Sequence, residues 1–410
     1  MNVMIKPLVI SYSYLSEKSS TGQIQRVFFE YLKEHGFDPT IICAESYHND
    51  VDTEKLNCRL LPIRSIQIIR YFIAFLKRVV AEEYAYLPDY SYFSWALPYA
   101  IRKTKKEALS GKYDYIHSTC TTFSSHIVAL EAKKVSNLPW VAFFYDPWYE
   151  NPYRPIKSSK FKERDRLMEM QVAEHADVIV HTNYAIYNDW VERYGEDIKR
   201  KMRVMPLVFN NKFNVDSNGK KTKNKYVISH IGTLYLNRNS VDFLKALKIM
   251  FDDHPNLKDS IELNYVGTVT NEDKNAVEKL GLSDITFFRG FLSEQECKPY
   301  FEDADLFLAV DGKDASTIFF PSKIMKYFFF HKPILGLTPE GSSLEYELKQ
   351  SQNYCFRNDD HQGISECLYN LVSSRNECSI HDKEYWRKFT MGKIEPEYEK
   401  MIMQLLSIKK

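Results

Sequence analysis

The sequence has almost no net charge and no cysteine pattern that marks a metal site or a disulfide framework. Its 55 Lys and Arg nearly balance 54 Asp and Glu, so the net charge is +1. This excludes the broad positive field of a nucleic-acid-binding protein, although it leaves room for a local basic patch. The seven cysteines contain no CxxC pair, which is typical of reduced thiols in the cytoplasm.

Long apolar runs are also missing. The start "MNVMIKPLVISYSY" has too short an apolar run for a signal peptide, and no window approaches the roughly 20 apolar residues of a membrane-spanning helix. We therefore expect a cytoplasmic protein that at most binds to the surface of a membrane. With 44% apolar residues, a chain of 410 residues is sufficient for two domains of ordinary size.

Short β-rich runs alternate with helical patterns along the chain, and this alternation predicts parallel sheets covered by helices on both faces. The alternation occurs twice, interrupted by the polar, Asn- and Lys-rich stretch 209–225, which is typical of a linker. We predict an α/β protein with two doubly wound, Rossmann-like domains facing a cleft. The predicted strands lie at 7–12, 39–43, 58–63, 113–118, 140–146 and 177–182, and then at 226–232, 261–267, 285–290, 305–310 and 333–337.

In open parallel sheets, ligands bind beyond the carboxyl ends of the strands. The stretch "SEKSSTGQIQRVFFEYLKEHG" at 16–36 lies at such a place, because it follows the first predicted strand and has Thr21 and Gly22 at the start of a helix. This arrangement suits a loop that approaches a phosphate. It equally suits an ordinary loop with a glycine near the helix start.

Three segments of the second half are more specific. "HIGTLYLNR" at 230–238 places Gly232 and Thr233 after a strand, with Arg238 a few residues on. "FFRGFLSEQECKPYFEDADLFLAV" at 287–310 is read as strand, glycine, Ser-capped helix and strand. "FFPSKIMKYFFFHKPIL" at 319–335 opens a helix with Lys323 in its first turn.

These segments together resemble the nucleotide-sugar domain of GT-B glycosyltransferases, in particular family 4 and its bacterial surface-polysaccharide branch. The chain is similar to that branch at three further places, which are "DPW" at 146–148, "RVMPLVFN" at 203–210 and the terminal helix at 384–406. The resemblance implies four parts of the chain. They are an acceptor-side domain at 1–208, the linker at 209–225, a nucleotide-sugar domain at 226–383 and a helix at 384–410 that crosses back to the first domain.

The resemblance also implies roles for the residues of the donor site. Thr21 and Gly22 would approach the donor diphosphate and the acceptor, and Gly232 and Thr233 would line the donor site. Arg238 and Lys323 would neutralise the diphosphate, and Lys323 would act together with the amides of the helix start at Ser322. A lysine in a first helical turn is otherwise simply solvated.

One position departs from the family pattern. Relatives carry a ribose-binding glutamate three residues after the lysine, where this chain has Lys326, and the acidic position eight residues earlier is Ile318. A lysine cannot accept hydrogen bonds from ribose hydroxyls, so donor binding must differ or be weak. Glu340 and Glu345 are candidate substitutes, although both also suit a solvated loop.

His117 and Asp146 are predicted at the carboxyl ends of two strands of the first domain. His117 is a candidate for binding the transferred sugar or the acceptor, and Asp146 for orienting or deprotonating the acceptor hydroxyl. Alternatively, His117 caps a strand and Asp146 begins a turn. We regard His126, His175 and His181 as structural. No acidic DxD-like cluster stands on a loop, and GT-B relatives generally work without a metal, so we expect no metal and no cofactor.

The segment 63–80, "IRSIQIIRYFIAFLKRVV", is predicted to form a helix with a wide apolar face and a basic edge. Such a helix suits a membrane interface, where a lipid-linked acceptor would be found. It also suits a helix packed on a sheet. The basic residues Arg64, Arg70, Lys77 and Arg78 all fall on its polar side.

The sequence therefore predicts a glycosyltransferase, of hexosyl or related type, that moves a sugar from a nucleotide-sugar donor to a lipid-linked glycan acceptor of bacterial surface polysaccharide. Family resemblance implies retention of the anomeric configuration. The alternative is a non-catalytic GT-B protein that binds a glycan or a partner enzyme, and Lys326 keeps this alternative open. A sugar-nucleotide epimerase would need a set of acidic and His groups that we do not find. No nucleic-acid partner is expected.

Overall fold

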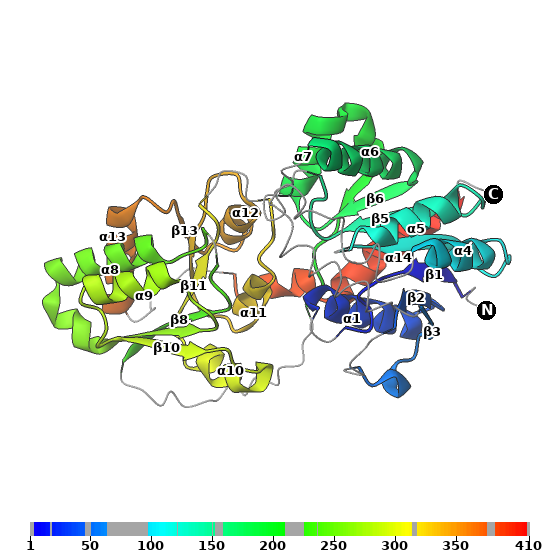
Figure 1. The fold of residues 1–410 in the computed structure, drawn as a ribbon. Helices are drawn as coiled ribbons and strands as arrows, with labels where there is room; N and C mark the ends of the chain where they lie inside the picture. Colours follow the sequence, from blue (N-terminus) through cyan, green and yellow to red (C-terminus); the bar gives the residue numbers. More distant parts are fainter. Residues whose placement is uncertain are drawn as a thin grey trace, which may run out of the picture. The chain divides into compact units, whose positions relative to one another are not determined.

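The computed structural model divides the chain into two compact units, each of which is described here by itself (Figure 1). Unit 1 comprises Met1–Asn210 and Phe389–Lys410, and unit 2 comprises Asn211–Lys388. Most of the predicted linker at 209–225 and of the predicted amphipathic helix at 63–80 lies outside the described residues. The structure describes residues 4–16, 19–45, 51–63, 97–120, 122–149, 151, 159–209, 225–235, 237–313, 318–374 and 382–407.

Unit 1 is built on a seven-stranded parallel sheet with the order β3-β2-β1-β4-β5-β6-β7. The order reverses beside β1, as in a doubly wound sheet. Its strands are β1 (Pro7–Ile10), β2 (Thr40–Ala44), β3 (Arg59–Ile63), β4 (Tyr115–Thr119), β5 (Trp140–Phe144), β6 (Val178–His181) and β7 (Met202–Val204). Its described helices are α1 (Ser20–Glu34), α4 (Leu97–Ala108), α5 (Ser124–Lys133), α6 (Ser159–His175), α7 (Tyr184–Tyr194) and α14 (Met391–Ser407).

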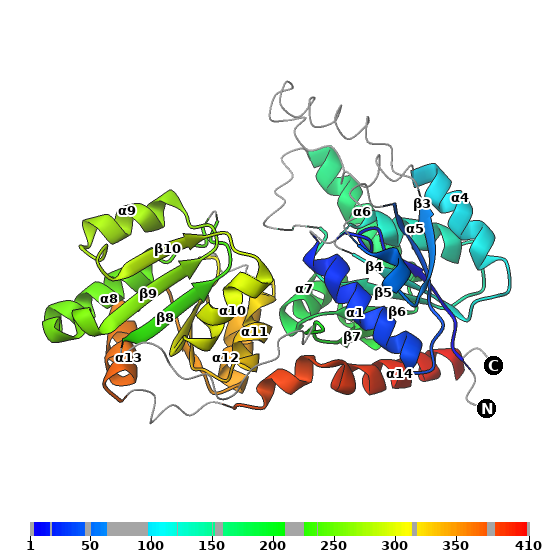
Figure 2. The same cartoon turned by 90° about the horizontal axis from the view of Figure 1, so that it is seen from below.

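The centre of the unit 1 sheet is buried on both faces, which explains why its strands are nearly continuous apolar runs. Every residue of β1, β4, β5 and β6 is buried. The C-terminal α14 packs beside α1 (Figure 2). Its Tyr398 hydroxyl lies 2.8 Å from the Tyr115 hydroxyl and 2.7 Å from Nδ1 of His117. These contacts fasten the last helix of the chain to the sheet of unit 1.

Unit 2 is built on a six-stranded parallel sheet with the order β10-β9-β8-β11-β12-β13. The strands are β8 (Tyr226–Ile231), β9 (Ile261–Val266), β10 (Thr286–Gly290), β11 (Leu306–Val310), β12 (Ile334–Leu337) and β13 (Tyr354–Phe356). The helices are α8 (Val241–Asp253), α9 (Asn271–Lys279), α10 (Glu294–Glu302), α11 (Lys323–Phe329), α12 (Ser343–Gln350) and α13 (His361–Ser374).

The two faces of the unit 2 sheet have different coverings. Side chains of α8, α9 and α13 form one apolar core with alternate residues of the strands. On the other side, aromatic rings from α10 and α11 meet β11, with Phe301 stacked on Phe330 and Phe307 stacked on Tyr327. The prediction of two doubly wound α/β domains is therefore confirmed for the sheets and their layers. None of the helices in the described part of the chain has the length and apolarity needed to span a bilayer.

Candidate functional site

The loop after β8 forms one wall of the candidate site in unit 2. Gly232 follows the strand directly and has φ +140°, a conformation that favours glycine. A Cβ at this position would lie 3.0 Å from Cδ of Lys323. The glycine therefore lets the lysine side chain pass close to the end of β8. Thr233, the next residue, is exposed.

Arg238, further along this loop, forms a buried ion pair. Its guanidinium donates to Oδ1 of Asp311 over 2.8 Å, and the side chains are 11% and 0% exposed. Asp311 comes directly after β11, and its Oδ1 also accepts from the Gly312 amide at 2.9 Å. Burial raises the pKa of Asp311, and the positive charge of Arg238 opposes this shift. Asp311 thus fixes the position of the Arg238 guanidinium at the ends of the strands.

Lys323, the first residue of α11, reaches the same place from the crossover between β11 and β12. Its Nζ lies 3.0 Å from Nε2 of His230, a buried residue of β8. Burial lowers the pKa of Lys323 to about 7, with a further lowering by Arg238 and a partial offset by Asp311. Ser322 precedes the helix, is exposed and makes no side-chain cap. The geometry thus brings together Gly232, Arg238 and Lys323 at the carboxyl edge of one sheet.

Asp311 and His230 belong to this group but were missing from the sequence-based set. The one available signal is position, because Asp311 directly follows the predicted strand 305–310 and His230 lies near the end of the predicted strand 226–232. Thr338, directly after β12, also lies at this edge of the sheet. Its hydroxyl lies 3.4 Å from Oδ2 of Asp311 and 2.6 Å from the Ser342 hydroxyl.

The two residues considered for contact with the donor ribose, Lys326 and Glu345, form hydrogen bonds to other side chains or backbone groups. Nζ of Lys326 donates to Oε1 of Glu294 at 2.7 Å. Glu345 lies in the first turn of α12, where one oxygen accepts from the Gly341 amide and the other from Lys349, both at 2.6 Å. Because both carboxylate oxygens of Glu345 already have partners, four residues before and four residues after it, the geometry gives its predicted ribose contact no support. Its role stays a prediction.

In unit 1, the structure explains why residue 22 is a glycine. The Ser19 hydroxyl caps α1 by accepting from the Gly22 amide at 3.1 Å. A Cβ on Gly22 would overlap the carbonyl oxygen of Ser13, in the turn after β1. Glycine is therefore needed for the close approach of helix and turn, and the neighbouring Thr21 is buried. The predicted contact with the donor stays a prediction.

The two predicted catalytic residues of unit 1 lie in different surroundings. His117 does not end its strand, as the sequence suggested, because β4 continues to Thr119. Its ring is 1% exposed and contacts Tyr398, and burial lowers its pKa to about 3. These surroundings favour a structural role over contact with a sugar. Asp146 is half-buried and lies just beyond the end of β5, as a residue that approaches an acceptor would.

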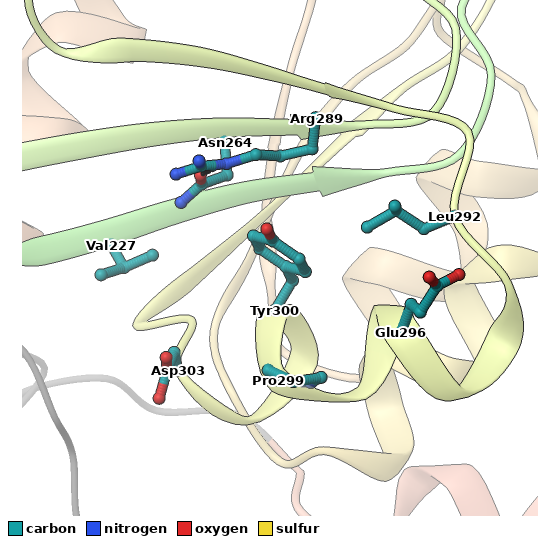
Figure 3. Close-up of a pocket in the computed structure, with 8 residues that line it drawn as sticks. All are labelled: Val227, Asn264, Arg289, Leu292, Glu296, Pro299, Tyr300 and Asp303. Carbon is teal, nitrogen blue, oxygen red and sulfur yellow. Dashed lines mark hydrogen bonds between the residues drawn. The ribbon is translucent and has the colours of Figure 1, made fainter.

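A separate hollow of about 470 Å³ lies between α10 and the sheet of unit 2. Figure 3 shows Glu296, Pro299 and Tyr300 on α10, across from Asn264 and Arg289 on the strands. Nε of Arg289 donates to Oδ1 of Asn264 at 2.9 Å. None of the predicted site residues lines this hollow, and its central polar groups bond to one another. The described residues contain no group of three or more His, Cys, Asp or Glu side chains placed to hold a metal ion.

Comparison with known protein families gives one match, and it lies in unit 1. Residues 27–210 match the model of Glycosyltransferase Family 4, which is less than half of the chain. No curated protein matches the sequence.

Solved structures with the same fold cover nearly the whole chain. HepE from Anabaena, in complex with UDP and glucose, is 12% identical with a TM-score of 0.67 and covers 97% of this chain and 99% of that chain. Sucrose-phosphate synthase from Thermosynechococcus elongatus is 13% identical with a TM-score of 0.67, over 98% and 100%. A TarM mutant from S. aureus, in complex with fondaparinux, alpha-GlcNAc-glycerol and UDP, is 8% identical with a TM-score of 0.61, over 98% and 100%. The fold is GT-B, and with the family match it supports a glycosyltransferase.

Proposed function

We propose that this protein transfers a sugar from a UDP-sugar to a glycan acceptor, with the diphosphate bound at the carboxyl edge of the unit 2 sheet. The observation that carries the proposal is the position of Lys323 beside Gly232 and Arg238. A glycine leaves room there, and two basic side chains supply charge for a diphosphate leaving group. Uridine is proposed because HepE and the TarM mutant hold UDP.

In the proposed reaction, the bond between the anomeric carbon and the diphosphate oxygen breaks while the acceptor hydroxyl forms a new bond to the same carbon. The anomeric configuration is retained. The proton of the acceptor hydroxyl passes to the departing phosphate oxygen, so that no separate protein base is required. Lys323 and Arg238 stabilise the negative charge that the diphosphate gains. Asp146 orients the acceptor hydroxyl.

We propose a lipid-linked glycan of bacterial surface polysaccharide as the acceptor, reached at the inner face of the membrane. The support is the resemblance of several motifs to that branch and the basic amphipathic pattern at 63–80. Vesicle co-sedimentation tests this part. Neutralising Arg70, Lys77 and Arg78 together should weaken binding to anionic vesicles, because each basic residue contributes about 1 kcal/mol at such a surface. Equal binding of the wild type and the triple variant would contradict membrane docking by this segment.

The proposed donor site is tested by calorimetric titration with UDP. Lys323→Ala should weaken UDP binding by about 1.5–3 kcal/mol, the size of a charge-assisted hydrogen bond. Lys248→Ala is the matched control, because Lys248 is a lysine of α8 that pairs with Asp252. Unchanged UDP affinity of Lys323→Ala would remove Lys323 from the site and with it the main support for the proposal.

A second candidate is a protein that binds a glycan or a partner enzyme without catalysis. Lys326 favours it, because this lysine stands where relatives have the ribose-binding carboxylate. A transferase must consume UDP-sugar in the presence of its acceptor, whereas a binding protein leaves the donor intact. Donor turnover with an acceptor extract therefore separates the two functions.

A further inference from the structure

His230 is a buried histidine whose two ring nitrogens both have defined partners. Nδ1 lies 2.9 Å from the carbonyl oxygen of Leu308, and Nε2 lies 3.0 Å from Nζ of Lys323. A carbonyl oxygen can only accept, so Nδ1 must carry the hydrogen. A neutral imidazole then has its lone pair on Nε2, and Lys323 donates to it. Burial lowers the pKa of His230 well below its usual value, and the charges of Lys323 and Arg238 lower it further. Backbone hydrogen bonds to Leu308 and Gly232 oppose this shift only in part, so the ring stays neutral.

Two features determine where the Lys323 side chain lies. Near its middle, Cδ passes the open side of Gly232, at 3.0 Å from the place where a Cβ would be. At its end, Nζ donates one hydrogen to His230. The charged groups nearby are Arg238 and Asp311, which form an ion pair with each other. The remaining hydrogens of Nζ are available to a ligand at the edge of the sheet.

We infer that His230 is a positioning residue, which holds the amino group of Lys323 in place for the diphosphate of the donor. This inference rests on the proposed function, because it requires that Lys323 binds the diphosphate. A long, flexible side chain loses rotamer freedom when it binds a ligand, and an acceptor that already fixes its end reduces this loss. Removal of the Nε2 acceptor should therefore weaken diphosphate binding although His230 never touches the ligand.

The same arrangement has a consequence for protons. Lys323 has a pKa of about 7, so at pH 8 most molecules carry a neutral amine there. A bound diphosphate favours the ammonium form. UDP binding at pH 8 should thus take up a proton, by as much as one per site. The number of protons taken up is measured by calorimetry in buffers of different ionisation enthalpy. Lys323→Arg provides the baseline, since arginine stays charged throughout.

Two substitutions separate positioning from packing. In His230→Asn, the amide group keeps a donor for Leu308 but offers no acceptor near Lys323. In His230→Gln, the longer side chain can bring its carbonyl oxygen to the place of Nε2. We expect His230→Asn to keep the thermal stability of the wild type, to bind UDP about three- to tenfold more weakly and to change the proton uptake. His230→Gln should restore most of the affinity.

The outcomes are distinguishable. If Lys323→Ala loses UDP affinity while His230→Asn keeps the affinity and proton uptake of the wild type, His230 has only a packing role and the inference is overturned. If neither variant changes UDP binding, the proposed donor site is wrong and the inference falls with it. Nitrogen-15 NMR of the wild-type histidines gives a test that needs no variant. It should show hydrogen on Nδ1 of His230 between pH 6 and pH 8, and hydrogen on Nε2 would also overturn the inference.

Discussion

Lys326 and Glu294 form a partly exposed pair, and this makes position 326 suitable for a functional test. Their side chains are 33% and 51% exposed and their charged atoms are 2.7 Å apart. Such a pair contributes less than about 1 kcal/mol to stability. Substitution of Lys326 should therefore report on the donor site and not on folding.

We predict that Lys326→Glu lowers donor turnover. The new carboxylate would lie beside Glu294 and would repel the phosphates of the donor. Turnover of UDP-sugar with one acceptor extract provides the measurement, and Glu294→Gln, which removes the partner but keeps the lysine, is the matched control. The opposite outcome is a wild type without turnover and a Lys326→Glu variant with increased nucleotide affinity or turnover. It would favour the non-catalytic protein, because the variant would have regained a hydrogen-bond acceptor that the wild type lacks.

At the donor site, the sequence identifies residues that belong to a recognisable family motif. It does not identify residues whose only distinction is a contact with one of those motif residues. Arg238 and Lys323 belong to recognisable stretches. Asp311 lies 73 positions from Arg238 in the chain, and His230 lies 93 positions from Lys323. Nothing local identifies such partners, since they meet only when crossovers of the sheet bring its strand ends together.

At the scale of elements, the loops after β8, β9 and β10 are joined by short backbone contacts. The Gly232 amide donates to Val266, and the Gly267 amide donates to Gly290, both at 2.7 Å. Gly267 has φ +122°, and a Cβ there would overlap the carbonyl oxygen of Gly232. The position of the Gly232 loop thus depends on a glycine in the neighbouring loop.

Gly267→Ala should therefore disturb both the fold and the site. We expect a loss of about 2–4 kcal/mol of unfolding free energy, together with weaker UDP binding. Gly281→Ala is the control for backbone strain alone, because Gly281 has φ +65° and open space around a Cβ. That variant should lose only about 1 kcal/mol and bind UDP normally. Thermal unfolding with and without UDP measures both effects, and equal results for the two variants would contradict a steric link between the loops.

The eleven predicted strands all have counterparts in the sheets, with ends that differ by a few residues. Buried parallel strands are recognisable because they are nearly continuous apolar runs between helical patterns. The two strands that the prediction missed, β7 (Met202–Val204) and β13 (Tyr354–Phe356), have three residues each and lie at sheet edges. Three residues carry too little periodicity to indicate a strand.

At the scale of the whole molecule, the last helix shows how distant parts of the chain share a core. α14 belongs to unit 1 although the whole of unit 2 precedes it in the sequence. Its Tyr398 is 0% exposed and bonds to both Tyr115 and His117 of β4. The sequence indicated this return only through family resemblance, since amphipathic periodicity does not identify the surface on which a helix packs. The sequence makes His117 a candidate for the reaction centre because it is predicted at a strand end, whereas its contacts place it in this core.

Three histidines are buried among the described residues of unit 1, and we expect them to make its stability depend on pH. His117, His126 and His181 are each at most 1% exposed, and burial lowers the pKa of each to about 3. In an unfolded chain a histidine has a pKa of about 6.5. Between these values the unfolded state binds protons that the folded state does not. The unfolding free energy should therefore fall as the pH decreases from about 6.5 to about 3, by at most about 1.4 kcal/mol per pH unit for each histidine.

His181→Phe provides the sharpest test of this pH dependence. The His181 ring packs against both Phe144 and Trp190, and neither of its nitrogens has a hydrogen-bond partner among the described residues. Phenylalanine should thus fit the same space, remove the titrating group and leave about two thirds of the slope. Urea unfolding between pH 7 and pH 5, followed by tryptophan fluorescence, measures the change. His175→Phe, at an exposed position of α6, should keep the slope of the wild type. A wild-type slope in His181→Phe would show that His181 does not contribute to the acid sensitivity of unit 1.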